Sequence, residues 1–313
     1  MSGLFNSFYY GKAGKADFTP DQLPKNRVQL FFSMLRVRVS GLIGLNLLQI
    51  LFSLPAIAWT IINAMVLIYS SGIDPETGEI TDAVSAGMMS GNIMFYLLLM
   101  IPCLMIASIG RMGLAMPMRN WARDEHSFVW SDFKDTVKAN WKTALAIGFI
   151  NGASLLLTYV GFTYYSAMTA QSMFWIVPQV LIVMFCCIWW MSTMVLYPMA
   201  VTYDMKFRVL IQNSIIMTLA RLPFAFLCWA PITFIPLIVA YFVPSNIVLV
   251  VLALYYILFG FALYQFLAAS YANACFDRFL NPRIDGADVN KGLRDPAYND
   301  EDDTVTDEDI KNL

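Results

Sequence analysis

Residues 39–73 read VSGLIGLNLLQILFSLPAIAWTIINAMVLIYSSGI and contain no Asp, Glu, Lys or Arg. About 20 mostly apolar residues are enough for an α-helix to cross the hydrocarbon core of a bilayer. Lipid offers no partners to backbone N–H and C=O groups, so a crossing segment must bond its own backbone, as a helix does. This stretch therefore predicts a membrane-spanning helix over Ser40–Tyr69.

Three more stretches lack charged side chains, and they lie between Asp82 and Arg111, Lys142 and Asp204, and Arg221 and Asp277. The first fits one span and each of the others fits two. With 58% apolar and only 13% charged residues, the chain has about half the charge of a soluble domain. The sequence predicts an all-α polytopic membrane protein with six spans, at Ser40–Tyr69, Asn92–Ile109, Asn140–Tyr165, Met173–Val201, Leu222–Phe242 and Ile247–Phe276.

The basic residues indicate an orientation. All 20 lysines and arginines fall before the first span, between the second and third, between the fourth and fifth, or after the sixth. These four segments share one side of a six-span topology. Because Lys and Arg near span ends stay in the cytoplasm, we expect both termini there. Arg111 is assigned to a cytoplasmic loop, 110–139, so no charge is expected inside a span.

The chain divides into three regions. Residues 1–39 form a cytoplasmic and interfacial segment, residues 40–284 the membrane domain, and residues 285–313 an acidic tail that we expect to be unstructured. An outer loop, 71–91, is expected to be a solvated hairpin. Calcium binding is the alternative there, although its acids lack the spacing of an EF-hand.

Amphipathic segments precede the three pairs of spans. They are Arg27–Arg38, Phe128–Lys142 with Ser131 as the expected N-cap, and Lys206–Arg221. A basic amphipathic helix lies in the membrane interface, so we expect these segments on the cytoplasmic surface. Their recurrence suggests a threefold repeat of segment, span, turn and span.

The sequence contains no recognisable catalytic set. His126 is the single histidine, so the two-histidine motif of a zinc protease is excluded. Ser154 follows Gly152 and Ala153, but no span residue would activate it, and Gly152 and Ser154 instead predict close helix packing. We therefore expect a protein that is not an enzyme, with no cofactor, no metal and no nucleic-acid partner. The five cysteines lie in or beside spans and predict no disulfide.

Two sets of residues are candidates for function. Polar residues within the spans would line a cavity for a neutral solute or, equally, form hydrogen bonds between helices; the candidates are Asn46, Gln49, Asn151 and Gln179. Basic, acidic and aromatic residues around the second amphipathic segment would dock a partner protein or seat the helices at the lipid headgroups. Those candidates are Arg119, Trp121, Arg123, Asp124, Glu125, Trp130 and Lys134.

Two segments of the chain are similar to a known family. They are NRVQLFFSMLRVRVSGLIGLNLLQILFSLP at Asn26–Pro55 and MRNWARDEHSFVWSDFKDTVKANW at Met118–Trp141. Together with Tyr197-Pro198-Met199 and Thr202-Tyr203-Asp204, they resemble the YesL-like family, integral membrane proteins of Gram-positive bacteria with no assigned function. Members are commonly encoded beside carbohydrate ABC importers. The resemblance implies a plasma-membrane accessory that assists sugar uptake through contact with the importer permeases. A stand-alone permease or channel for a neutral solute is the alternative.

Overall fold

A computed structural model describes residues 23–70, 86–243 and 245–294. Within these ranges all regular structure is helical, and six helices are long and apolar enough to cross a membrane. The predicted fold class is confirmed. The solvated-hairpin and calcium alternatives concern a loop that lies mostly outside the described residues, and so do most of the N-terminal segment and the acidic tail.

The elements follow the predicted order. Two helices are much longer than their predicted spans, and the last span is divided in two by a π-helical turn, η3. The bounds are α2 Arg27–Val37, α3 Val39–Ser70, α4 Ala86–Trp121, α5 Val129–Thr169, η2 Met173–Trp175, α6 Ile176–Thr202, α7 Phe207–Ala220, α8 Leu222–Phe242, α9 Asn246–Tyr255, η3 Tyr256–Gly260, α10 Phe261–Phe279 and η4 Asn281–Arg283.

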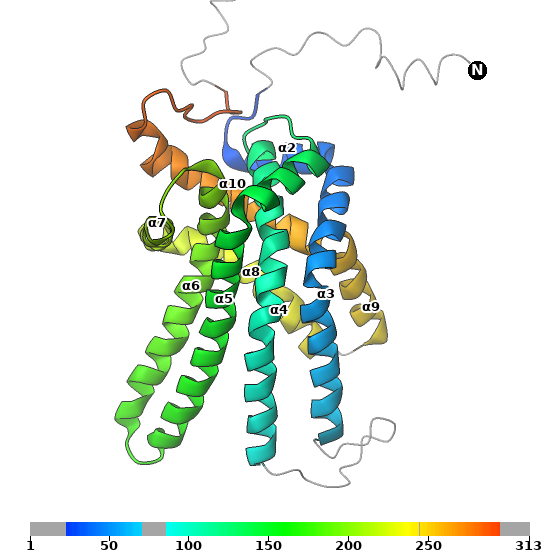
Figure 1. Ribbon diagram of the computed structural model, residues 1–313, viewed down its shortest axis with the longest axis vertical. Coiled ribbons are helices and arrows are strands. Elements are labelled where there is room, and N and C mark those ends of the chain that lie inside the picture. The colour runs from blue at the N-terminus through cyan, green and yellow to red at the C-terminus, as the bar shows by residue number, and fades with distance from the viewer. Residues whose placement is uncertain (1–22, 71–85, 244, 295–313) are drawn as a thin grey trace, which may run out of the picture.

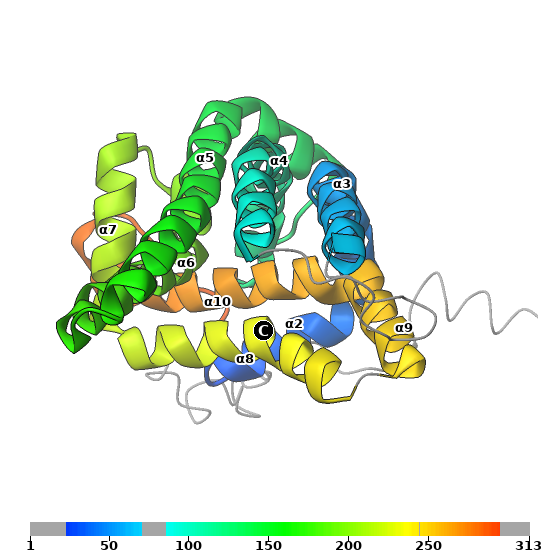
Figure 2. The same cartoon turned by 90° about the horizontal axis from the view of Figure 1, so that it is seen from below.

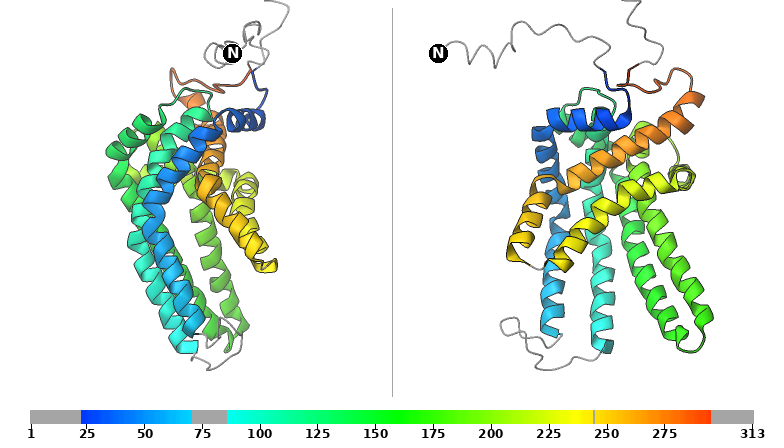
Figure 3. Two further views of the ribbon diagram at one scale, coloured as in Figure 1. Left: turned by 90° about the vertical axis from the view of Figure 1, so that its right-hand side faces the viewer. Right: turned by 180° about the vertical axis from the view of Figure 1, so that it is seen from behind.

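Two long hairpins, α3–α4 and α5–α6, form a curved layer (Figures 1 and 2). Helix α10 crosses this layer obliquely and contacts α3, α4 and α6, while α8 lies beyond it and contacts α10 and α6. Helix α2, the connection between α4 and α5 and the end of α10 share one end of the bundle (Figure 3), which we call the α2 end. These are segments that carry the basic residues, so the predicted clustering is seen, while its cytoplasmic orientation stays a prediction.

Helix α4 runs well beyond the predicted end at Ile109, and α5 begins well before Asn140. The second amphipathic segment is therefore the start of α5 and not a separate helix. The prediction of Ser131 as N-cap is wrong: the cap residue is Phe128. The Oδ2 of Asp132 accepts hydrogen bonds from Phe128 N at 3.0 Å and Ser127 Oγ at 2.6 Å, which satisfies a free N–H of the first turn.

Helices α4 and α5 approach each other closely through glycine. A Cβ on Gly148 would lie 2.5 Å from Met105 Cα, and one on Gly152 would lie 2.7 Å from Ile101 Cα. Small residues let helix backbones come together inside a bilayer. The prediction that Gly152 serves close packing is confirmed, and this contact fixes α4 against its neighbour.

The sixth predicted span corresponds to one candidate span, Asn246–Arg283, but a π-helical turn interrupts its α-helix. Helix α9 ends at Tyr255, and the chain changes direction through η3 before α10 begins (Figure 3). A π-turn shifts the hydrogen-bond register and leaves backbone groups without helical partners. Asn46 of α3 supplies those partners. Its Nδ2 donates to the carbonyls of Tyr256 at 2.9 Å and Ile257 at 2.7 Å, and its Oδ1 accepts from Phe261 N and Ala262 N, each at 3.0 Å.

Candidate functional site

A cavity of about 470 Å³ lies in the membrane domain between the α3–α4 hairpin and helices α8 and α10. That volume falls within the range of small-molecule sites. At one end the cavity reaches Thr60 and Ile61 of α3, which are exposed. Its aromatic wall is formed by Trp190, Tyr256, Phe261 and Tyr264, and its polar lining by Gln49, Ser53, Thr60, Ser108, Arg111, Asn151 and Gln265.

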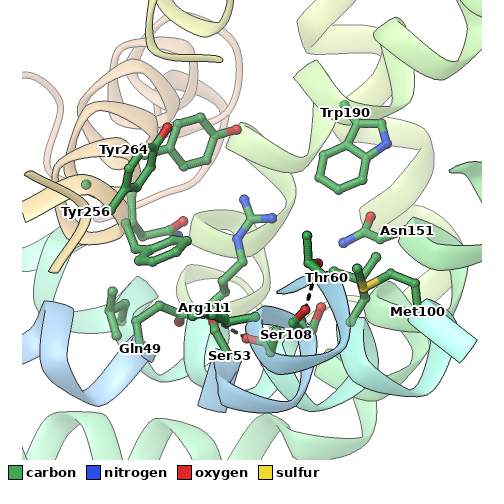
Figure 4. Close-up of a pocket in the computed structure, with 18 of the residues that line it drawn as sticks. Gln49, Ser53, Thr60, Met100, Ser108, Arg111, Asn151, Trp190, Tyr256 and Tyr264 are labelled. Atoms are coloured by element: carbon green, nitrogen blue, oxygen red, sulfur yellow. Dashed lines mark hydrogen bonds between the residues drawn. The ribbon is translucent and has the colours of Figure 1, made fainter. Parts of the chain in front are cut away.

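Arg111 brings a positive charge into this cavity. It extends from α4 toward Tyr264 (Figure 4), and its guanidinium carbon lies 4.7 Å from the ring centroid of Tyr197 and 5.4 Å from that of Tyr264. Arg111 lies within helix α4, in the candidate span Met89–Trp121, so the prediction that it belongs to a loop, with no charge inside the spans, is wrong. Cation–π contact with two rings offsets part of the cost of placing the guanidinium there.

Several buried polar atoms around the cavity have no hydrogen-bond partner. They are Arg111 Nη2, Gln49 Oε1, Trp190 Nε1 and both amide atoms of Gln265. The Gln49 and Gln265 side chains belong to residues only 1% and 2% exposed. Unpartnered buried polar groups are costly, about 1–3 kcal/mol each, so these five atoms would gain free energy from a polar partner in the cavity.

Gln49 is held in place by its other amide atom. Its Nε2 donates to Ser53 Oγ at 2.9 Å and to the carbonyl of Ala107 at 3.1 Å. A Cβ on Gly110 would lie 2.8 Å from Gln49 Oε1, so the glycine gives this side chain room. The bonds fix the amide nitrogen, while the oxygen, which lies beside Gly110, has no hydrogen-bond partner.

Asn151 also lines the cavity, but its polar atoms are already bonded. Its Oδ1 accepts from Trp189 Nε1 at 2.9 Å, and its Nδ2 donates to Tyr197 Oη at 3.4 Å. Tyr197 Oη donates in turn to Ser108 Oγ at 2.8 Å. This network joins α4, α5 and α6 and holds the Tyr197 ring against Arg111.

The four polar candidates differ in whether they line the cavity. Gln49 and Asn151 line the cavity, whereas Asn46 and Gln179 do not. Asn46 is fully buried and bonds the backbone of η3 and α10, so its cavity assignment is wrong and the hydrogen-bonding alternative is correct. Gln179 is half-buried on α6, away from the cavity.

Arg111, Trp190, Tyr264 and Gln265 line the cavity but were not chosen as candidates from the sequence. One signal was available for Arg111: it is an isolated charge followed by the apolar run Met112–Met118. Such a run extends a span past the charge, and a charge inside a span faces the protein interior. Nothing local in the sequence distinguishes the other three.

The seven docking candidates do not form one exposed surface. Trp121 and Arg123 are buried at 1% and 6% exposure, while Asp124, Trp130 and Lys134 are exposed. Arg119 and Arg123 contact Glu125 at 2.9 and 3.1 Å. Four of the candidates therefore make contacts within the protein that join the end of α4 to neighbouring segments; they are Arg119, Trp121, Arg123 and Glu125. The side chains of the other three are exposed at the surface.

The first part of the acidic tail packs onto these residues. Lys291 contacts Glu125 at 3.3 Å, and Arg123 Nη2 donates to the carbonyl of Asp288 at 3.4 Å. Gly292 adopts a φ of +83°, and a Cβ there would lie 2.7 Å from Arg123 O. Residues 285–294 thus contact the α2 end through ion pairs and backbone bonds, while the prediction of an unstructured tail concerns mainly residues that the structure does not describe.

Arg27 at the start of α2 forms an ion pair with Asp277 near the end of α10. Burial lowers the pKa of Arg27, and the charge of Asp277 opposes that change. Nearby, burial raises the pKa of Tyr203 to about 12, and its hydroxyl donates to Asn281 Oδ1 at 2.5 Å. These contacts hold α2, α10 and the segment after α6 together at the α2 end.

We expect Arg27→Met to lower the free energy of unfolding by about 2 kcal/mol, because it leaves the Asp277 carboxylate buried without its cation. Adding Asp277→Asn should restore part of the loss. Lys291→Met, at a side chain that is 45% exposed, should change the stability less. Thermal unfolding of the purified proteins in detergent measures all three, and an Arg27→Met protein as stable as the parent would contradict this role.

Comparison with known families yields a match over part of the chain. Residues 42–162 match the model of a protein family of unknown function, DUF624, of which YesL is itself a member. The match covers α3, α4 and most of α5, and it includes Gln49, Arg111 and Asn151 but not Trp190, Tyr264 or Gln265. No curated protein and no solved structure matches the chain.

Proposed function

We propose that this chain is a non-enzymatic accessory protein of carbohydrate uptake in a bacterial plasma membrane, and that its membrane domain binds a small polar solute. The cavity is the observation that carries the proposal. The DUF624 domain and the YesL-like resemblance support the link to sugar uptake, and the distribution of basic residues supports cytoplasmic termini.

The chemistry of the cavity suits a polyhydroxylated solute. Amide groups donate and accept hydrogen bonds and so pair with hydroxyl groups of either polarity. Gln49 and Gln265 offer such groups with atoms still unpartnered. Aromatic faces, as offered by Trp190 and Tyr264, pack against the C–H surface of a ring. Apolar walls with a few convergent polar groups are the usual composition of small-molecule sites.

We expect a strain lacking this chain to take up at least one labelled oligosaccharide more slowly than the parent, and to grow more slowly on it. Complementation with the intact gene should restore uptake, whereas the Gln49→Leu, Gln265→Leu double variant should not, because its cavity no longer pairs with hydroxyl groups. The Gln179→Leu variant is the matched control, since that glutamine lies outside the cavity. Unchanged uptake across a broad sugar panel would count against the proposal.

The accessory role also requires contact with the importer permeases. Trp130 is 64% exposed, and Lys134 is exposed one turn further along the same helix. These are the residues from the predicted docking set that a partner reaches directly, with Asp124. Copurification from mild detergent tests the contact, and permeases absent from the eluate would oppose it.

A stand-alone permease is the second candidate, because the cavity lies among the spans and reaches exposed residues at one end. The two candidates differ in a single measurement. Proteoliposomes that contain only this chain should show no sugar flux if it is an accessory protein and a saturable flux if it is a permease.

A further inference from the structure

We propose that the solute bound in the cavity carries an anionic group, a carboxylate or a phosphate, and that Arg111 receives it. The ligand class is then a soluble sugar acid or sugar phosphate and not a neutral sugar. This inference rests on the proposed solute site and adds the charge of the ligand and the residue that recognises it.

The first step is the missing counter-charge. A charged side chain inside a span is energetically costly and is normally paired or faces a functional cavity. Within the described ranges, no ion pair includes Arg111, and neither Asp nor Glu lines the cavity. The protein thus keeps a costly charge facing a cavity and supplies no carboxylate for it.

The second step is what the two tyrosine rings provide. Tyr197 and Tyr264 lie 4.7 and 5.4 Å from the guanidinium carbon. Ring contacts of this kind hold the guanidinium in position and compensate for part of the hydration free energy that it loses on burial. Arg111 also forms a side-chain hydrogen bond with Tyr264, but in the described part of the chain its Nη2 has no hydrogen-bond partner. An unpartnered guanidinium N–H matches a carboxylate or phosphate oxygen, which accepts a charge-assisted hydrogen bond from arginine.

The third step is the set of neutral groups beside this charge. Gln265, on the same helix as Tyr264, has both amide atoms unpartnered at 2% exposure, and Gln49 has its oxygen unpartnered at 1%. Water satisfies amide groups but supplies no negative charge. An unpaired cation and unpartnered amides around one cavity are together complementary to a ligand with both an anionic group and hydroxyl groups.

Binding to the purified full-length chain in phosphatidylcholine nanodiscs tests the inference. Isothermal titration with glucose, glucuronate and glucose 6-phosphate compares a neutral, a carboxylate and a phosphate form of one sugar framework. We expect one of the two anionic sugars to bind roughly 10- to 100-fold more tightly than glucose, since charge-assisted hydrogen bonds contribute that much. Whether glucuronate or glucose 6-phosphate binds more tightly shows whether the site prefers a carboxylate or a phosphate.

Variants assign the preference to a residue. Arg111→Met should remove the roughly 10- to 100-fold preference for the anionic sugar and leave glucose binding unchanged, while Arg111→Lys should retain a part of it because the charge remains without the planar fork. Arg278→Met, at an exposed arginine of α10, is the matched control. If Arg111→Met does not fold, the comparison of the three sugars on the parent protein still decides the question.

The other outcomes are distinct. Equal binding of glucose and both anionic sugars would overturn the inference and leave the proposed solute site standing. Binding in phosphatidylcholine discs that disappears in phosphatidylglycerol discs would assign the site to a lipid headgroup and overturn the soluble ligand. No binding of any sugar would overturn both the inference and the solute site.

Discussion

Replacing Asn46 by leucine is expected to cost about 4 kcal/mol of folding free energy, estimated from the 1–3 kcal/mol cost of each buried polar group left unpaired. One side chain bonds four backbone groups, the carbonyls of Tyr256 and Ile257 and the N–H groups of Phe261 and Ala262. In lipid those groups have no water to replace it. Thermal unfolding and the yield of monodisperse protein in detergent measure the loss.

The matched control lies on the same helix. Asn63 is also buried, but among the described residues its Nδ2 donates only to the carbonyl of Trp59 in its own helix at 2.9 Å, so within that part of the chain Asn63→Leu removes no bond between helices. It should cost much less than Asn46→Leu. Equal losses for the two variants would mean that Asn46 does not stabilise the π-turn in the way described. Because η3 and α10 supply Tyr256, Tyr264 and Gln265 to the cavity, Asn46→Leu should also weaken ligand binding.

Replacing Gly148 by alanine is expected to lower the free energy of unfolding by about 3 kcal/mol, the upper range for overpacking a core. The added Cβ would lie 2.5 Å from Met105 Cα and 2.7 Å from Leu104 O. Both are backbone atoms, so relief requires α4 and α5 to separate. Gly148→Leu should yield no folded monodisperse protein.

Whether Gly148→Ala lowers or raises the free energy of unfolding shows whether α4 and α5 are in close contact at this position. Alanine in place of glycine within a helix normally stabilises it, by about 0.5–1 kcal/mol. A Cβ on Gly44 of α3 meets nothing within 4 Å, so Gly44→Ala is the matched control and should be neutral or stabilising. A Gly148→Ala protein as stable as the Gly44→Ala protein would show that α4 and α5 do not approach closely at this position.

The cavity links these two predictions to function. Gly148 sets the position of α4, which carries Arg111, and Asn46 sets the direction of α10, which carries Tyr264 and Gln265. The site is therefore assembled from contacts made elsewhere in the bundle. Variants at either position should weaken ligand binding without touching the ligand, whereas Arg111→Met should change the selectivity between charged and neutral sugars.

Much of the fold was predictable because its determinants are local. Whether a segment crosses the bilayer as a helix depends on its own length, hydrophobicity and charge, which can be read directly from the sequence. For this reason the spans at Ser40–Tyr69 and Leu222–Phe242 match α3 and α8 closely. The boundary at Ile109 was wrong because Arg111 was taken as the end of the span, although a charge that faces a cavity does not end a helix.

The sequence by itself thus determined six long apolar helical spans, their order and the clustering of most basic residues in the segments that connect them. Only the tertiary structure decided where the cavity lies, that Arg111 faces it, that Asn46 supports a π-turn and that Arg119, Trp121, Arg123 and Glu125 serve internal contacts. The physical reason is sequence separation. Asn46 bonds residues more than 200 positions away, and Arg111 meets Tyr264 only after α10 crosses α4, so no local pattern in the chain records these contacts.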